Sequence, residues 1–271
     1  MTRRLSVLLL PLLLSGCVIH VDGTACSSAD YESNQAVQLD GAGLTALQVN
    51  AEAGRLEIIG DPAQNNIAVE AVLYSSGPEA DEHQFSLVRQ GDVAVLTATQ
   101  NSQFGCWNDS PRIDMVVRVP AGLALEVEDG SGDMTIHGMT APLNIDDGSG
   151  SLTINGGQTL RLVDGSGDTW VEGIAGNATV EDGSGSLRLS KMGGDVRVDD
   201  GSGDLTISDV AGQVEVSDGS GSLVVESVQG NVTVDDGSGD IRIRQTGGFT
   251  LIEGGSGGLS VSDVNGPVTL N

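Results

Sequence analysis

The chain has 271 residues and a formal net charge of −26, from 38 acidic and 12 basic side chains. Phosphate backbones repel so negative a chain, which argues against a nucleic-acid partner. Aromatic residues make up only 3% of the chain, whereas glycine contributes 40 residues. Any core must therefore be narrow and aliphatic.

Residues 1–16 have the layout of a secretory signal peptide, with two arginines, a short apolar run and then small residues. The run is too short to span a bilayer. Residues 14–17, LSGC, resemble the lipobox of bacterial lipoproteins, which implies cleavage before Cys17 and acylation of that residue. Val18 stands where an Asp would retain a lipoprotein at the inner membrane, so the resemblance implies an outer-membrane location, on its periplasmic or surface face.

Two cysteines remain once Cys17 carries the lipid. Cys26 and Cys106 would lie in an oxidising compartment, where we expect them to form a disulfide. By the chain-entropy estimate, a bridge over so long a loop adds about 4 kcal/mol of stability. Residues 17–35 are interpreted as a polar, lipidated tether.

The pattern of apolar residues in 36–128 predicts strands. Apolar residues alternate with polar ones in pairs such as Leu47 and Val49, or Leu56 and Ile58, and glycine or proline turns separate these pairs. No repeat register runs through this part. We therefore interpret it as an irregular N-terminal β region of the repeat that follows.

Residues 129–271 are built from a regular repeat. The motif Asp-Gly-Ser-Gly recurs at steps of 18 residues, apart from one step of 17, starting at Asp129, Asp147, Asp164, Asp182, Asp200, Asp218 and Asp236. Between motifs, apolar residues fall in pairs two apart, as in Leu205 and Ile207, which is strand alternation. One unit cannot bury its apolar side alone, but stacked units can. The sequence thus predicts an all-β fold, a single-stranded β-solenoid (β-helix) with 18-residue coils and two short strands per coil.

Residues 117–123, VRVPAGL, are followed by LEV at 125–127 and by a run of short Ser-Gly turns. Together they resemble the bacterial putative-adhesin β-solenoid family, formally a domain of unknown function. The similarity covers about residues 45–271. It implies a β-helical fold and a place in the cell envelope.

The seven aspartates that begin the motifs would stack in one column, and calcium is one means of offsetting their repulsion. However, the calcium-binding nonapeptide repeat has its ligand Asp where this chain has apolar residues such as Leu205 and Leu223. The fifth turn position also alternates between Asp and Ser, which spaces its charges about 9.6 Å apart. We therefore interpret the aspartates as turn caps that require no cofactor, and keep a calcium site as the alternative.

One departure from the repeat suggests a surface contact. Trp170 occupies a slot that should face outward, and Arg188 follows one coil later in the same column. The two side chains would stack as a cation–π pair or form a small binding patch for a sugar or protein. The three histidines are scattered and predict no catalytic site.

The sequence thus predicts a non-enzymatic, lipid-anchored protein of the cell envelope. It would act as an adhesin or interaction scaffold that presents an acidic solenoid surface to an envelope protein or polysaccharide. Two alternatives stay open: a calcium-binding repeat module, and a β-helical carbohydrate-active enzyme with its site in residues 50–128.

Overall fold

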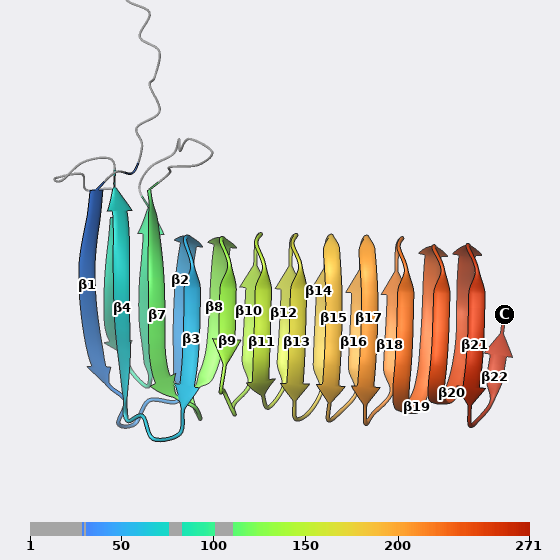
Figure 1. Ribbon diagram of the computed structural model, residues 1–271. Helices are drawn as coiled ribbons and strands as arrows, with labels where there is room; N and C mark the ends of the chain where they lie inside the picture. The colour runs from blue at the N-terminus through green and yellow to red at the C-terminus, as the bar shows by residue number, and fades with distance from the viewer. Residues whose placement is uncertain (1–28, 30, 76–82, 101–110) are drawn as a thin grey trace, which may run out of the picture.

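The computed structural model describes residues 29, 31–75, 83–100 and 111–271. Short strands stack along one axis and form a rod, so the predicted β-solenoid is confirmed (Figure 1). Every regular element in these ranges is a strand. Consequently, this part of the chain holds no helix long and apolar enough to cross a membrane.

Each coil has two walls joined by two turns. The wall that ends in the Asp-Gly-Ser-Gly turn is called the Asp wall. It consists of β8 (Ala124–Ser131), β10 (Leu143–Asp147), β12 (Leu160–Asp164), β14 (Ala178–Asp182), β16 (Val196–Asp200), β18 (Val214–Asp218) and β22 (Val268–Leu270).

The opposite wall carries Trp170 and is called the Trp wall. It consists of β9 (Met134–His137), β11 (Leu152–Gly157), β13 (Thr169–Ile174), β15 (Gly185–Met192), β17 (Gly203–Val210) and β21 (Leu259–Val264). Two long strands, β19 (Leu223–Ser238) and β20 (Ile241–Ser256), run from the Trp wall around the second turn into the Asp wall.

Neighbouring coils pair in parallel with equivalent residues side by side. Val198 pairs with Val216, for example, and Leu189 pairs with Ile207. Alternate residues of each strand point inward, so the stacked coils enclose a continuous aliphatic core. Phe249 is its largest fully buried side chain.

The first coil of the solenoid lies earlier in the chain than the regular motif. Strand β2 (Ala46–Ala53) pairs in parallel with β8, and β3 (Leu56–Asp61) pairs in parallel with β9. Residues 46–61 therefore form a coil directly on the first repeat coil (Figure 1). The segment between them in sequence forms the adjoining end of the rod.

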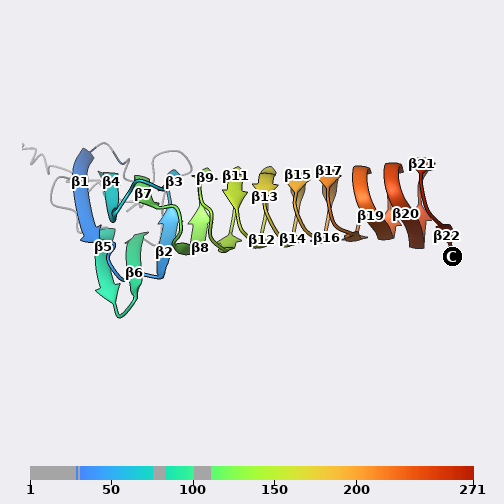
Figure 2. The same cartoon turned by 90° about the horizontal axis from the view of Figure 1, so that it is seen from below.

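At that end both walls are extended by longer strands. The Trp wall continues through β7 (Arg112–Pro120), β4 (Asn66–Ser75) and β1 (Tyr31–Asp40), and the Asp wall through β6 (Val93–Gln100) and β5 (His83–Gln90). The outermost pairings are antiparallel, unlike those of the repeat, and the two extensions lie on opposite sides of the rod (Figure 2).

Strand β1 corrects one predicted boundary, because it takes in residues 31–35, which the sequence assigned to the tether. The strand lies at the edge of the sheet and pairs only with β4, and residues 31–36 are exposed. A strand that buries so little side-chain area needs no apolar alternation, so its sequence is like that of a tether.

The second turn of the coil depends on glycine for space. The glycine there, as at Gly212, has no positive φ. A Cβ atom there would lie 2.5 Å from the carbonyl oxygen of Gly194, so glycine is needed for close stacking. The positive φ occurs three residues earlier, for example at Asp209, with φ of 56°. Asp is among the few residues that tolerate this region.

Candidate functional site

The seven aspartates that begin the motifs lie inside the rod. Each follows two inward-facing apolar residues at spacings of two, as Asp200 follows Val196 and Val198. Their side chains are between 1% and 6% exposed. Consecutive members pair from coil to coil, which makes one buried line of carboxyl groups. We call these residues the aspartate column: Asp129, Asp147, Asp164, Asp182, Asp200, Asp218 and Asp236.

Four members of the column cap their own turns as the sequence predicted. The amide N–H two residues further on donates to Oδ1 of Asp164, Asp182, Asp200 or Asp236 at 3.1 Å. Asp164 also accepts a hydrogen bond from the Thr169 hydroxyl, at 2.5 Å from its Oδ2. These bonds orient the carboxyl groups and hold the tight turn.

Burial disfavours the ionised form of these carboxyl groups. Burial first, and then repulsion from the neighbouring aspartates of the column, raise the pKa of Asp147 and that of Asp182 to about 7. Burial likewise raises the pKa of Asp129 and that of Asp218 to about 6. At Asp164 the raised pKa is partly offset by the bonds from Thr169 and Ser166.

The acidic surface of the rod comes from other residues. On the Asp wall, the residue before the column aspartate faces outward, and it is acidic in five coils: Glu128, Asp146, Glu181, Asp199 and Asp235. The acidic members of the fifth turn position are exposed as well. Asp168 Oδ1 accepts the N–H of Ser186 in the next coil at 3.2 Å, and Asp133, Asp204 and Asp240 bond equivalent residues. These hydrogen bonds, between an Asp of one coil and the amide of the next, join neighbouring coils.

A calcium site at the aspartate column stays a prediction. In the described ranges, no three acidic or histidine side chains converge as metal ligands. Ca²⁺ takes about six to eight oxygen ligands, whereas the column presents its carboxyl groups in a line inside an aliphatic core.

Trp170 and Arg188 lie where the sequence placed them. Trp170 is 49% exposed on the Trp wall, and Arg188 pairs with it in register on the next strand. The Arg188 Cζ lies 5.4 Å from the centre of the indole ring, which confirms the cation–π contact. Asp168, Asp204 and the hydroxyl residues Thr153 and Thr206 line the same shallow groove of about 470 Å³. We call it the Trp170 groove.

Arg188 differs from most exposed cations of the rod. Arg161 pairs with Glu181 and Arg197 with Glu215, at 3.1 and 2.7 Å. Lys191 and Arg244 likewise contact acids of neighbouring coils. Within the described ranges Arg188 takes part in no ion pair, so its guanidinium donors stay open to a ligand.

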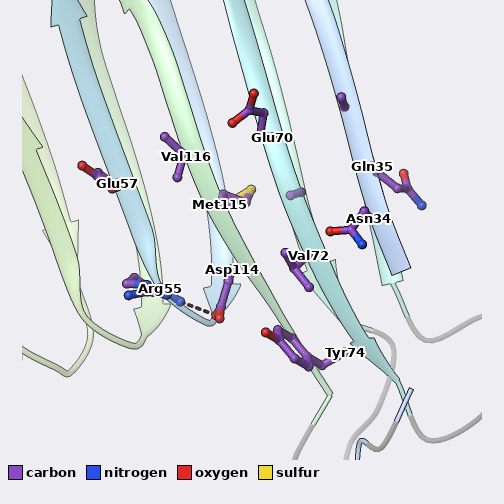
Figure 3. Close-up of a pocket in the computed structure, with 12 residues that line it drawn as sticks. Asn34, Gln35, Arg55, Glu57, Glu70, Val72, Tyr74, Asp114, Met115 and Val116 are labelled. Atoms are coloured by element: carbon purple, nitrogen blue, oxygen red, sulfur yellow. Dashed lines mark hydrogen bonds between the residues drawn. The ribbon is translucent and has the colours of Figure 1, made fainter. Parts of the chain in front are cut away.

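A second depression, of about 620 Å³, lies at the N-terminal end of the rod over β1, β4, β7 and β3. Figure 3 shows Val72 and Val116 among carboxylates and Tyr74. No sequence pattern predicted it, because it arises where strands distant in the chain pair side by side.

The carboxylates of this depression already have partners. Glu70 contacts Arg118 at 3.3 Å, and Glu57 Oε1 lies 3.4 Å from His137 Nε2. Asp114 Oδ1 accepts a hydrogen bond from the backbone N–H of Arg55 at 2.9 Å. The carboxylates that line this depression are thus held by contacts with neighbouring strands.

The three remaining residues with a predicted role lie outside the described residues. These are the lipidation site Cys17 and the expected disulfide between Cys26 and Cys106. All three stay predictions.

Comparison with known proteins places the chain in a family. Residues 45–252 match the family model described as Toastrack DUF4097. A search of curated proteins finds no match. A "putative lipid binding protein" from Parabacteroides distasonis is 14% identical in sequence, with a TM-score of 0.46 over 90% of this chain and 98% of that one.

Two further solved structures resemble the chain. A "putative adhesin" from the same species is 12% identical, with a TM-score of 0.43 over 88% of this chain and 97% of that one. Another, from Bacteroides fragilis, is 13% identical, with a TM-score of 0.38 over 89% and 98%. Because the family match spans most of the chain, the protein belongs to the Toastrack DUF4097 family, and the resemblance drawn from the sequence is confirmed.

Proposed function

We propose that this member of the Toastrack DUF4097 family is a non-enzymatic, lipid-anchored protein of the cell envelope. It would act as an adhesin-like scaffold that binds a saccharide through the Trp170 groove. The lipobox-like residues 14–17 support the anchor. The observation that carries the binding role is the half-exposed Trp170, stacked with Arg188, which forms no ion pair among the residues that the structure describes.

A saccharide fits the chemistry of the groove better than an apolar ligand does. The indole offers a flat apolar surface to the C–H face of a sugar ring, and it is anchored to a strand, so little side-chain entropy is lost on binding. Asp168 and Asp204 can accept hydrogen bonds from sugar hydroxyls, and Arg188 can donate them. A few polar groups around an apolar platform is the usual composition of a small-ligand site.

The test is titration of the purified chain with a panel of soluble envelope oligosaccharides, followed by isothermal calorimetry. Binding by at least one oligosaccharide is expected, with Trp170→Ala and Arg188→Ala each weakening it about tenfold, since each contact contributes about 1 kcal/mol or more. The matched control is Arg242→Ala, which removes another exposed arginine from the same outward column, outside the groove.

Equal loss of binding in Arg242→Ala would indicate nonspecific attraction by positive charge, and no binding across the panel would overturn the saccharide assignment. A reducing-sugar assay on the same panel separates binding from turnover. Release of sugar above the blank would instead support the enzymatic alternative.

A further inference from the structure

The aspartate column places seven acidic side chains in the interior of a chain with very few other polar groups there. The only other buried polar side chains in the described ranges are Thr169 and Thr246. The column begins beside Ala51 of the first coil and ends beside Gly254 of β20. It therefore runs the length of the repeat, closed at both ends by small residues.

Several carboxyl oxygens of the column have no hydrogen-bond partner. At Asp182, Asp200 and Asp236, Oδ1 is bonded but the buried Oδ2 is not. At Asp129, Asp147 and Asp218, both oxygens are buried and unpaired. Amides such as that of Ser149 lie near these groups and lower their pKa in small part, outside hydrogen-bond geometry. Buried polar atoms without partners are rare and need an explanation.

No positive charge compensates the column. None of the ion pairs in the described ranges includes one of its members. Asp147 faces Asp129 and Asp164 on the adjoining strands and has Asp146 beside it on its own strand. Asp218 faces Asp200 and Asp236.

The Trp wall offers the column no charge either. The first inward-facing residues of its strands β9 to β20 are buried and apolar, as Leu152 and Leu223 are, with Thr169 as the exception that donates to Asp164. Every titratable group near Asp147 or Asp218 is therefore another acid.

Seven ionised carboxylates cannot be stable in this arrangement. At a strand spacing of about 4.8 Å and an effective dielectric constant of about 20, each neighbouring pair repels about fourfold more strongly than it would in water. A carboxylic acid removes the charge and supplies the donor that its neighbour lacks. A bond between a carboxylic acid and a carboxylate is also among the stronger hydrogen bonds in proteins.

We propose that the aspartate column holds protons up to near-neutral pH, on Asp147 and, at slightly more acidic pH, on Asp218. Each of these acids donates its O–H to an unpaired carboxyl oxygen one coil away: Asp147 to Asp129, and Asp218 to Oδ2 of Asp200 or Asp236. The column is thus a line of shared protons inside the rod. It makes the stability of the solenoid fall as pH rises.

The direction of this pH dependence follows from the difference in proton binding between the folded and unfolded states. The pKa of Asp147 is about 7 and that of Asp218 about 6, against 3.8 for an ordinary aspartate. The folded state therefore binds more protons, and its extra stability is complete below about pH 3.8 and lost as pH rises through 6 to 7. Each retained proton raises the unfolding constant about tenfold per pH unit inside this window.

The experiment compares urea unfolding of the full chain and of Asp147→Asn between pH 4.5 and 8. The asparagine amide keeps a neutral donor in place. The slope of log K for unfolding against pH should therefore be about one unit smaller in the variant than in the parent. The variant should be at least as stable as the parent at pH 8. Asp146→Asn is the matched control, because it removes an exposed charge from the adjacent position of the same strand and should keep the parent slope.

Asp218→Asn repeats the test in a second coil and covers a failure of the first variant to fold. Infrared spectroscopy at pH 6 gives a direct readout on the parent, where the carbonyl band of a protonated carboxyl group should be present and should weaken in both variants. Absence of that band would overturn the proposal. So would a pH slope equal to that of the parent in both Asp147→Asn and Asp218→Asn. So would a loss of stability on EDTA treatment that calcium restores, because it would mean that cations and not protons neutralise the column.

Discussion

The hydroxyl of Thr169 donates a hydrogen bond to Oδ2 of Asp164, at 2.5 Å, inside the same coil. Equivalent positions in the neighbouring coils hold leucine, as at Leu152 and Leu187. Asp164 is consequently the one member of the aspartate column, among the residues described, with a side-chain donor. This bond favours its ionised form and lowers its pKa relative to burial alone.

Replacing Thr169 by Val should reveal that bond. The variant keeps the shape but leaves Asp164 without its donor, which should lower the free energy of unfolding by about 1–3 kcal/mol. Because the hydroxyl stabilises the carboxylate, the loss should be larger at pH 8 than at pH 5. Urea unfolding at both pH values measures it. Thr153→Val, at an exposed site of the neighbouring strand, should cost little, and an equal loss at the two pH values would contradict the assigned role.

Asp168 should contribute stability by joining two coils. Its Oδ1 accepts the N–H of Ser186 in the next coil at 3.2 Å. We expect Asp168→Ala to lower the free energy of unfolding by about 1 kcal/mol. Asp199→Ala removes an exposed acid of the Asp wall and serves as control for the loss of one charge. If both variants were stabilised alike, relief of net repulsion would dominate and the inter-coil bond would contribute nothing measurable.

Cys17 should carry the lipid anchor. When the full chain is expressed in a Gram-negative host with an alkyne-labelled fatty acid, the label should enter the protein and the protein should sediment with the membranes. Cys17→Ser should abolish the label and release the protein to a soluble fraction. Cys26→Ser should retain both, because only the thiol after the cleavage site is acylated. Label that persists in Cys17→Ser would refute the lipobox assignment.

The solenoid was predictable because its signal is local and repeated. Spacings of two between apolar residues and an 18-residue recurrence of one turn predict short strands and stacked coils, whatever lies elsewhere in the chain. The outward position of Trp170 followed from the same register. The N-terminal end of the rod could not be predicted this way, because β2 pairs with β8 across an insertion that carries no repeat.

At the aspartate column, strand alternation and residue type predict opposite positions for the side chain. Asp200 stands two residues after Val198 and four after Val196, so alternation alone puts it on the inner side of the strand. Its residue type argued for the surface, since aspartate is rarely buried unpaired. In a coil this narrow, the last inward position before the turn is enclosed by the coils above and below. The register of the strand therefore decides the position, and the protonation state adapts.

The sequence by itself determined the all-β class, the coil length, the alternation of the walls and the acidic character of the chain, because each depends on residues close together or on a fixed period. Only the tertiary structure decided which carboxyl groups are inside, which cations are left unpaired beside Trp170, and how the N-terminal strands cover the end of the rod. These features depend on contacts between coils, and the desolvation and repulsion that shape them exist only when the coils are stacked.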